Sequence, residues 1–312
     1  MVESLVMPPE GDPTAPHQPV QATQIQNPDW AGAKMRRPRR PAGWWLSAAM
    51  VGLILGLSAG LYLLAPVRTN ILLLGIDRRP GETNASRTDT MILTTVQPLQ
   101  PYVGMLSIPR DLWVTLPDGS QNRINTAHFF AEAASPGSGP EAAKRVVAQN
   151  FGVTVDDYLR LNFAGLRDFV DALGGVQIDL PQAMSGYPPG KHQLDGEQAL
   201  AFVRDRAGSD DFARMGRGQL FLKAVMKEMA SPAAWPHLPA ASLALLQSID
   251  TDVPAWEWPR LALALIRAGP DGIDGRVITR EMAHGFTTDG GAQVLAPDWS
   301  QINPVLKDMF NQ

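Results

Sequence analysis

The stretch Asn70–Asp77, NILLLGID, decides the fold of this chain. It is a short apolar run closed by glycine and aspartate, which has the length of a buried strand. Two similar runs follow, Thr90–Val96 (TMILTTV) and Tyr102–Ile108 (YVGMLSI), and the turn sequence QPLQP separates them. Strands that follow one another in sequence usually lie side by side. We therefore expect three antiparallel neighbours in one sheet.

In this arrangement the first strand ends at the edge of the sheet where the second begins and the third ends. That edge would collect Asp77, Arg87, Asp89, Arg110 and Asp111. Aspartates often serve only as turn residues. Two aspartates across one loop, beside arginines, instead favour Mg²⁺, which takes one or two carboxylates together with water and phosphate oxygens. The pattern predicts a site for a multiply phosphorylated ligand, because planar guanidinium groups bind phosphate oxygens.

More arginines follow a second set of helix and strand signals. Strands are expected at 157–163 and 176–180, a helix at 164–175, and a long helix from Asp210 or Asp211 to about Met229. This mixture predicts an α/β (α+β) domain, a three-layer mixed sheet flanked by helices. Further helix and strand signals continue to the C-terminal region, and no linker begins a second domain.

The arginines of this second set are Arg204 and Arg206 in FVRDR and Arg214 and Arg217 near the start of the long helix. A cation at a helix start opposes the helix dipole, whereas an anionic ligand there would reverse the sign of that interaction. The alternative is ordinary ion pairing. Arg214 and Arg217 would then pair with Asp210 and Asp211, and Arg204 and Arg206 with nearby carboxylates.

An apolar run with membrane-spanning length precedes the domain. No charged residue occurs between Pro41 and Val67, and at ~1.5 Å per residue a helix from Trp44 to Ala65 spans a hydrocarbon core of ~30 Å. Basic residues crowd the N-terminal flank, which predicts a cytoplasmic N-terminus and an extracytoplasmic domain. We expect a disordered cytoplasmic segment at 1–40, an anchor helix at 41–67 and a catalytic domain at 68–312, with the anchor retained and not cleaved.

Composition and missing motifs exclude several functional classes. The chain of 312 residues has no cysteine and a formal net charge of −4. It therefore has no disulfide, no thiolate nucleophile and no overall basic field for nucleic acid. His128 and His192 lack zinc-motif spacing, and GIDRRPG lacks the Gly-Lys-Ser/Thr ending of a phosphate-binding loop. No GxSxG motif is present, so Ser107 is interpreted as a strand-end residue.

The ordered motifs resemble those of the LytR-CpsA-Psr family of membrane-anchored cell-envelope phosphotransferases. They are NILLLGID, SRTDTMIL, MLSIPRDLWV, RINTAH, DYLRLNF, FVDALGGVQIDL, LDGEQALAFVRDR and DDFARMGRGQ. The match is strong over about residues 70–230 and weaker up to Phe310. The chain departs from the family pattern at Arg123, where lysine is usual, and at Gly218, where glutamine is usual.

The resemblance implies transfer of a glycopolymer from a polyprenyl-pyrophosphate carrier to peptidoglycan, with formation of a phosphodiester. It implies Asp77 and Asp89 as ligands of Mg²⁺, with Mn²⁺ as a substitute. The residues that it implies for pyrophosphate binding are Arg87, Arg110, Arg204, Arg206, Arg214, Arg217 and Gln219. We expect Asp77, Asp89, Arg110 and Asp111 to be catalytic, with Asp111 as a candidate general base. The alternatives are a polyprenyl-pyrophosphate hydrolase and a non-catalytic lipid-binding or regulatory protein.

Overall fold

The computed structural model describes residues 43–63, 67–76, 87–205, 210–269 and 272–310. The chain comprises two units, residues 1–53 and 54–312. Helix α1 (Gly43–Leu63) contains a candidate membrane span, Trp44–Leu63, by its length and apolar composition. The direction in which it would cross a membrane stays a prediction from the flanking charges.

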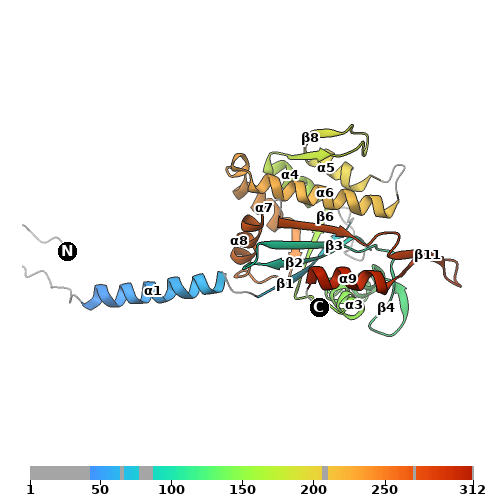
Figure 1. Ribbon diagram of the computed structural model, residues 1–312, viewed down its shortest axis with the longest axis horizontal. Coiled ribbons are helices and arrows are strands. Elements are labelled where there is room, and N and C mark those ends of the chain that lie inside the picture. The colour runs from blue at the N-terminus through green and yellow to red at the C-terminus, as the bar shows by residue number, and fades with distance from the viewer. Residues whose placement is uncertain (1–42, 64–66, 77–86, 206–209, 270–271, 311–312) are drawn as a thin grey trace, which may run out of the picture. The chain divides into compact units, whose positions relative to one another are not determined.

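A six-stranded mixed sheet forms the centre of the domain, in the order β10-β3-β2-β1-β6-β9 (Figure 1). Its strands are β1 (Thr69–Ile76), β2 (Thr88–Gln97), β3 (Tyr102–Ser107), β6 (Asp157–Asn162), β9 (Ile249–Thr251) and β10 (Ile273–Val277). The expected antiparallel pairs β1–β2 and β2–β3 are confirmed. Strand β6 pairs with β1 and β10 pairs with β3, both in parallel, so the sheet is mixed.

Three two-stranded ribbons stand apart from the central sheet. They are β4 (Trp113–Thr115) with β5 (Gln121–Arg123), β7 (Val176–Leu180) with β8 (Gly190–Leu194), and β11 (Ala283–Thr287) with β12 (Gln293–Pro297). The β11–β12 ribbon joins the C-terminal end of β3, because Leu295 N donates to Asp111 O at 3.1 Å.

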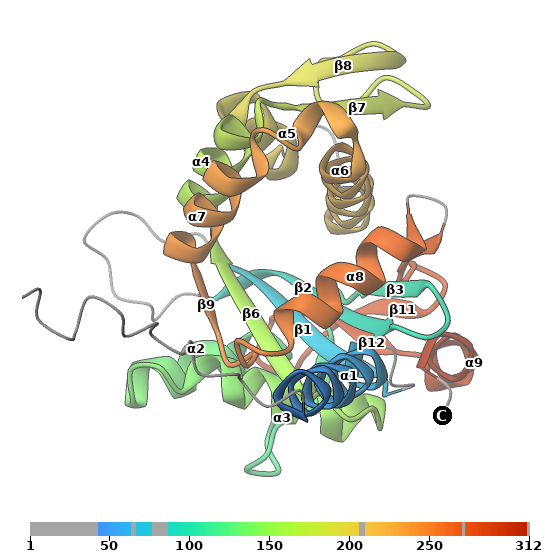
Figure 2. The same cartoon turned by 90° about the vertical axis from the view of Figure 1, so that its left-hand side faces the viewer.

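Helices cover both faces of the sheet (Figure 2). The helices of the domain are α2 (Thr126–Ala134), α3 (Gly139–Phe151), α4 (Phe163–Leu173), α5 (Gly196–Arg204), α6 (Asp211–Ala230), α7 (Leu238–Ser248), α8 (Trp258–Ala268) and α9 (Trp299–Phe310). Helices α2, α3 and α9 lie on one side, and α4, α5, α6 and α7 lie on the other with the β7–β8 ribbon. The layered fold expected from the sequence is confirmed.

Side-chain alternation along β1 divides the core between the two faces. Leu72 and Leu74 enter a cluster with residues of α3 and α9, whereas Ile71 enters a cluster with Leu261 of α8. Because successive side chains of a strand point to opposite faces, one apolar run serves both cores. Both clusters contain residues of β1, β2 and β3 and so hold these strands in place. The charged side chains lie where β2 begins and just after β3 ends.

Candidate active site

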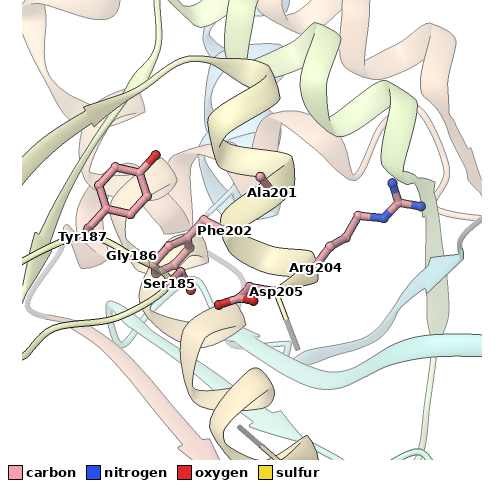
Figure 3. Close-up of a pocket in the computed structure, with 7 residues that line it drawn as sticks. All are labelled: Ser185, Gly186, Tyr187, Ala201, Phe202, Arg204 and Asp205. Carbon is pink, nitrogen blue, oxygen red and sulfur yellow. The ribbon is translucent and has the colours of Figure 1, made fainter. Parts of the chain in front are cut away.

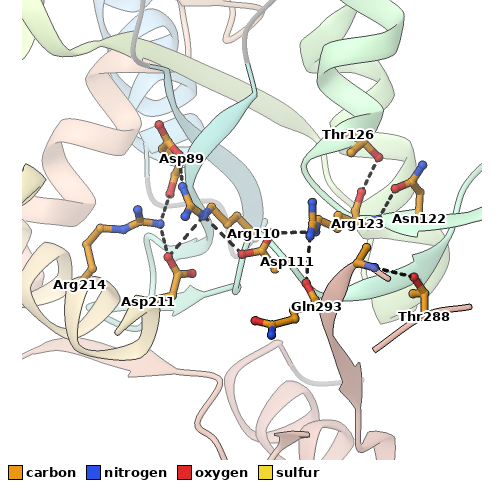
Figure 4. A network of polar contacts seen from close by, with 11 residues as sticks. Asp89, Arg110, Asp111, Asn122, Arg123, Thr126, Asp211, Arg214, Thr288 and Gln293 are labelled. Atoms are coloured by element: carbon orange, nitrogen blue, oxygen red, sulfur yellow. Dashed lines mark hydrogen bonds and ion pairs between the residues drawn. The ribbon is translucent and has the colours of Figure 1, made fainter. Parts of the chain in front are cut away.

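Four charged residues from three separate segments meet where β2 begins and β3 ends (Figure 4). Asp89 is the second residue of β2, Arg110 follows β3, and Asp211 and Arg214 occupy the first turn of α6. Arg110 Nη1 forms a short ion pair with Asp89 Oδ1, and its Nε lies 3.4 Å from Asp211 Oδ1. Arg214 pairs with the same Asp211 oxygen. Two guanidinium groups therefore share one carboxylate.

Helix α6 begins here because Asp210 caps it. The Asp210 side chain accepts a hydrogen bond from Ala213 N at 2.9 Å, which satisfies one free N–H group of the first turn. The start that was predicted from the two aspartates is confirmed. The cap directs the first turn of α6, and with it Arg214, toward β2.

Burial and charge shift the titration of this cluster. Burial lowers the pKa of the Arg110 guanidinium, but the negative charges of Asp211 and Asp89 more than reverse this, so its pKa is raised. Burial raises the pKa of the Asp211 carboxyl above its usual range, although Arg214 and Arg110 oppose this. Asp211 Oδ2 is buried and has no hydrogen-bond partner among the described residues. Asp211 is thus a poorly solvated carboxylate held between two cations.

A third arginine, Arg123, extends the network toward the β11–β12 ribbon. Asp111 Oδ1 lies 3.1 Å from Arg123 Nε, and Asp111 Oδ2 lies 3.6 Å from Arg110 Nε. Arg123 Nη2 also donates to the backbone carbonyl of Gln293 at 2.9 Å. The position where the resemblance has lysine therefore supplies a planar group that joins a site carboxylate to a neighbouring ribbon.

Arg87 and Arg204 lie beside aromatic rings. The Arg87 guanidinium carbon is 5.9 Å from the centre of the Phe129 ring, and that of Arg204 is 5.0 Å from the centre of the Phe163 ring. Both arginines are exposed. The part of these two arginines in one site with Arg110 stays a prediction.

A pocket of about 410 Å³ lies beside the C-terminal end of α5. The residues that line it are Ser185, Gly186, Tyr187, Ala201, Phe202, Arg204 and Asp205 (Figure 3). The Arg204 side chain extends away from Tyr187. Asp89, Arg110 and Arg214 do not line this pocket, so the charged network and the pocket are distinct features.

Arg217 and Gln219 are buried, with exposed fractions of 5% and 7%. Arg217 Nη2 donates to the backbone carbonyl of Asp205, which follows α5. Gln219 Nε2 donates to Met105 O at 3.2 Å, Ser107 Oγ at 2.8 Å and Arg276 O at 3.2 Å. These contacts tie α6 to α5, β3 and β10, and the predicted binding of pyrophosphate by both side chains stays a prediction.

Asp77 and Arg206 lie outside the described residues. Strand β1 ends at Ile76, which pairs with Thr88, the residue before Asp89. The donors available around this edge are carboxylate oxygens, which hard cations such as Mg²⁺ prefer. The orphaned Asp211 Oδ2 and the partly exposed Asp89 fit such an ion chemically. No group of three His, Cys, Asp or Glu side chains with metal-ligand geometry occurs in the part of the chain that the structure describes.

From the sequence, Asp211 was predicted only to cap α6 or to form an ion pair with a nearby arginine of the helix. The pair is present, and the contact with Arg110 is new. The i,i+3 spacing of Asp211 and Arg214 is a helix signal for the pair. The Arg110 contact joins residues 101 positions apart, so no local pattern indicates it.

Known proteins resemble the chain over most of its length. It is 33% identical to the polyisoprenyl-teichoic acid–peptidoglycan teichoic acid transferase TagU of Oceanobacillus iheyensis, over 64% of this chain and 73% of that protein. It is 27% identical to the regulatory protein MsrR of Staphylococcus aureus, over 60% of this chain and 57% of that protein.

The fold is also shared with solved structures. Bacillus subtilis TagV superposes with a TM-score of 0.63 at 25% identity, over 79% of this chain and 98% of that one. The model of the LytR_cpsA_psr family matches residues 65–309, which include the whole central sheet and the charged network. The chain belongs to the LytR-CpsA-Psr family.

Proposed function

We propose that this protein transfers a glycopolymer from a polyprenyl-pyrophosphate carrier to peptidoglycan and forms a phosphodiester. The observation that carries the proposal is the shared carboxylate: Asp211 holds Arg110 and Arg214 side by side at the start of α6. Two guanidinium groups and a helix N-terminus form a fitting site for a pyrophosphate. Relatives named as teichoic acid transferases favour this reading over other phosphate chemistry.

The charges of the network balance without a substrate. Three cations, Arg110, Arg123 and Arg214, face three carboxylates. These carboxylates are Asp89, Asp111 and Asp211. A pyrophosphate that takes over Arg110 and Arg214 would leave Asp89 and Asp211 without their counterions. A divalent cation would restore the balance, which is why a metal fits this site electrostatically.

Asp89 and Asp77 are the residues that would hold Mg²⁺, or Mn²⁺ in its place. Such an ion would polarise the pyrophosphate oxygens and stabilise charge on the leaving group. Arg110 and Arg214 would bind the phosphate oxygens and stabilise the same charge as it develops. Both side chains are held near the site before substrate arrives, and the substrate replaces the carboxylates as their partner.

In the proposed reaction a sugar hydroxyl of peptidoglycan attacks the phosphorus atom next to the glycopolymer. A new O–P bond forms, the P–O bond to the lipid phosphate breaks, and polyprenyl monophosphate leaves. Asp111 is the proposed acceptor of the hydroxyl proton. It has the most exposed carboxylate of the three, with 32% of its side chain accessible, compared with 21% for Asp89 and 20% for Asp211.

The location of the reaction is also part of the proposal. Helix α1 would anchor the chain, with residues 1–40 in the cytoplasm and the catalytic domain outside, because the basic cluster precedes the apolar run. A reporter enzyme that works only outside the cytoplasm should therefore be active when it is fused to the C-terminus. Added protease should digest the domain in intact spheroplasts, and protection of the domain would contradict this orientation.

Product analysis tests the reaction. The full-length chain in detergent or vesicles is supplied with a polyprenyl-pyrophosphate-linked glycan, Mg²⁺ and peptidoglycan. We expect polyprenyl monophosphate and glycan bound to peptidoglycan through a phosphodiester. Free glycan phosphate without the linkage would indicate a hydrolase, and no turnover with bound lipid would indicate a binding or regulatory protein. Arg110→Ala should be inactive, whereas Arg145→Ala on α3, at a side chain 62% exposed, should match the wild type.

A further inference from the structure

Helix α8 exposes apolar side chains on the side that faces away from the sheet. It packs against β2 and β3 and buries Leu261 and Ala264, which are 6% and 1% exposed. On the other side, Ile266 is 70% exposed and Arg267 beside it is exposed as well. A large aliphatic side chain left in water on an otherwise well-packed helix indicates an interaction surface when other apolar side chains surround it.

Three other exposed apolar residues lie around α8. They are Val67 before β1, Leu99 in the β2–β3 turn and Trp256 before α8, with exposed fractions of 56%, 51% and 67%. We call these three residues and Ile266 the end surface. Val67 and Leu99 belong to the end of the sheet where β1 starts, because Thr69 pairs with Val96 at the end of β2. Trp256 precedes α8 and Ile266 lies in its last turn, and α8 contacts this end of the sheet through two arginines.

Hydrogen bonds from two arginines of α8 hold the end surface together. Arg260 is 3% exposed, and its Nη2 donates to Val67 O at 2.6 Å and to Thr69 Oγ1 at 2.9 Å. Arg267 Nη1 donates to Pro98 O, next to Leu99, at 2.7 Å. Helix α8 is thereby fixed to the start of β1 and to the β2–β3 turn, so the end surface is formed without a partner.

The chain itself indicates what covers this surface. The candidate membrane span ends at Leu63 and β1 starts at Thr69, so only residues 64–68 join the two. Five residues extend at most about 20 Å. Val67 is one of these five residues, so the end surface begins within this distance of the end of the span. Tryptophan and aliphatic side chains near an arginine have the composition of a surface at the level of lipid headgroups.

We propose that the end surface rests on the lipid bilayer at the level of the headgroups, so that the domain is docked on the membrane as well as tethered to it. Trp256, Leu99 and Ile266 enter the interfacial region, and Arg267 meets anionic headgroups. The proposal requires α1 to span the membrane. It does not depend on the reaction proposed for the site.

Single-cysteine labelling tests the docking directly, because the chain has no cysteine of its own. An environment-sensitive fluorophore is attached to full-length Leu99→Cys and Ile266→Cys in vesicles of phosphatidylethanolamine and phosphatidylglycerol. Phe286→Cys in β11 is the matched control, since Phe286 is also exposed (38%) but lies at the C-terminal end of β3. In Figure 1, β11 and α8 lie at opposite ends of the sheet.

Lipids with a nitroxide quencher near the headgroup should lower the fluorescence at positions 99 and 266 about twofold and leave position 286 unchanged. Equal signals at all three positions would overturn the proposal in favour of a tethered, undocked domain. Signals at 99 and 266 that respond to protein density and not to quencher lipid would show that a second copy covers the surface, which also overturns it. The quenching experiment does not require turnover. A negative result would therefore overturn the docking proposal and leave the proposed reaction untouched.

A charged variant provides an independent check. The label at position 99 is read in the background Ile266→Glu, whose new carboxylate is exposed and should not disturb folding. We expect quenching at position 99 to fall to the level of the control, because a carboxylate opposes both the apolar interface and the anionic headgroups. Unchanged quenching at position 99 in a folded Ile266→Glu chain would also overturn the proposal.

Discussion

Arg214 Nη2 donates a hydrogen bond of 3.0 Å to the backbone carbonyl of Asp89. This bond joins the first turn of α6 to the start of β2, across 125 positions of sequence. Because the acceptor belongs to the main chain, a substitution of the Asp89 side chain leaves it in place. The site therefore allows the carboxylate of Asp89 and the position of Arg214 to be tested separately.

Lysine at position 110 or 214 should retain the positive charge but lose the planar guanidinium group, which can donate two parallel hydrogen bonds to a phosphate. We expect Arg110→Lys and Arg214→Lys to lower kcat/KM for the polyprenyl-pyrophosphate donor about 10- to 100-fold, since charge-assisted hydrogen bonds contribute ~1.5–3 kcal/mol each. Steady-state kinetics measures the effect. Arg145→Lys, on the exposed side of α3, is the control, and equal kinetics for all three variants would contradict phosphate binding by the site arginines.

Metal removal should abolish turnover if Asp89 holds a divalent ion. EDTA is expected to inhibit the wild type, and Mg²⁺ or Mn²⁺ should restore it. Asp89→Asn should be inactive at all metal concentrations, with thermal stability close to that of the wild type because the Arg214 bond to the backbone remains. Full activity of Asp89→Asn in metal-free buffer would rule out the metal-assisted mechanism.

Asp211 is expected to act by positioning Arg110 and Arg214. Asp211→Asn retains the shape but removes the shared charge, so the two guanidinium groups should separate and KM should rise about tenfold, with a smaller change in kcat. Asp210→Asn is the matched control, since asparagine caps a helix as well as aspartate does. A fall in kcat at unchanged KM would show a direct chemical role for Asp211.

Gln219 should matter for stability. Gln219→Leu keeps a similar volume but removes the donor that Met105 O, Ser107 Oγ and Arg276 O share. We expect the free energy of unfolding to fall by about 1–3 kcal/mol, as measured by denaturant titration. Gln149→Leu, at an exposed position of α3, should change it by less than ~0.5 kcal/mol. Wild-type stability with lost activity would instead support the pyrophosphate role predicted from the sequence.

A buried carboxylate should govern stability in acid. Glu132 is 2% exposed and accepts hydrogen bonds from Gly137 N, Gly139 N and Arg160 Nη1. Burial alone would raise its pKa, but these donors and the charge of Arg160 lower it below the ordinary value of 4.5. A lowered folded-state pKa gives stability that is present above the unfolded pKa and lost as pH falls through the folded one.

The wild type should therefore lose stability as pH drops below about 4.5, and the Glu132→Gln variant should lose less over the same range. Thermal melts between about pH 3 and about pH 7, on both sides of the glutamate pKa, give the comparison. Glu141→Gln, at an exposed α3 side chain (53%), is the control. Parallel curves for Glu132→Gln and the wild type would exclude Glu132 as the titrating group.

The fold near Asn70–Asp77 could be predicted because its pairings are local. Runs of apolar residues separated by short turns leave one simple topology for β1, β2 and β3, and the structure has it. The gathering of Asp89, Arg110 and Asp111 at one edge follows from that topology alone. The positions of β6 and β10 could not be predicted, because β10 pairs with β3 from about 170 residues away and alternation does not specify a partner.

The sequence predicted which residues form the site better than it predicted which of them contact one another. Arg110 and Arg214 were identified from their residue type and place, and the structure brings them together. Gln219 was chosen from a motif, and its hydrogen bonds with β3 and β10 depend on how α6 packs, which sequence spacing does not encode. The link from Asp111 through Arg123 to Gln293 likewise depends on where the β11–β12 ribbon lies.

The length of β1 has a consequence for the lipid carrier. Its eight residues separate the end surface from the charged network by about 26 Å, at ~3.3 Å per residue. On a docked domain whose β1 runs along the membrane normal, a pyrophosphate that reaches Arg110 must draw its hydrocarbon chain out of the bilayer over that distance. Exposing this chain to water would cost ~0.8 kcal/mol per CH₂ group, so the protein has to shield it along the way. A carrier whose extended chain is shorter than β1 would leave the bilayer entirely, and strand length thereby sets a minimum carrier length.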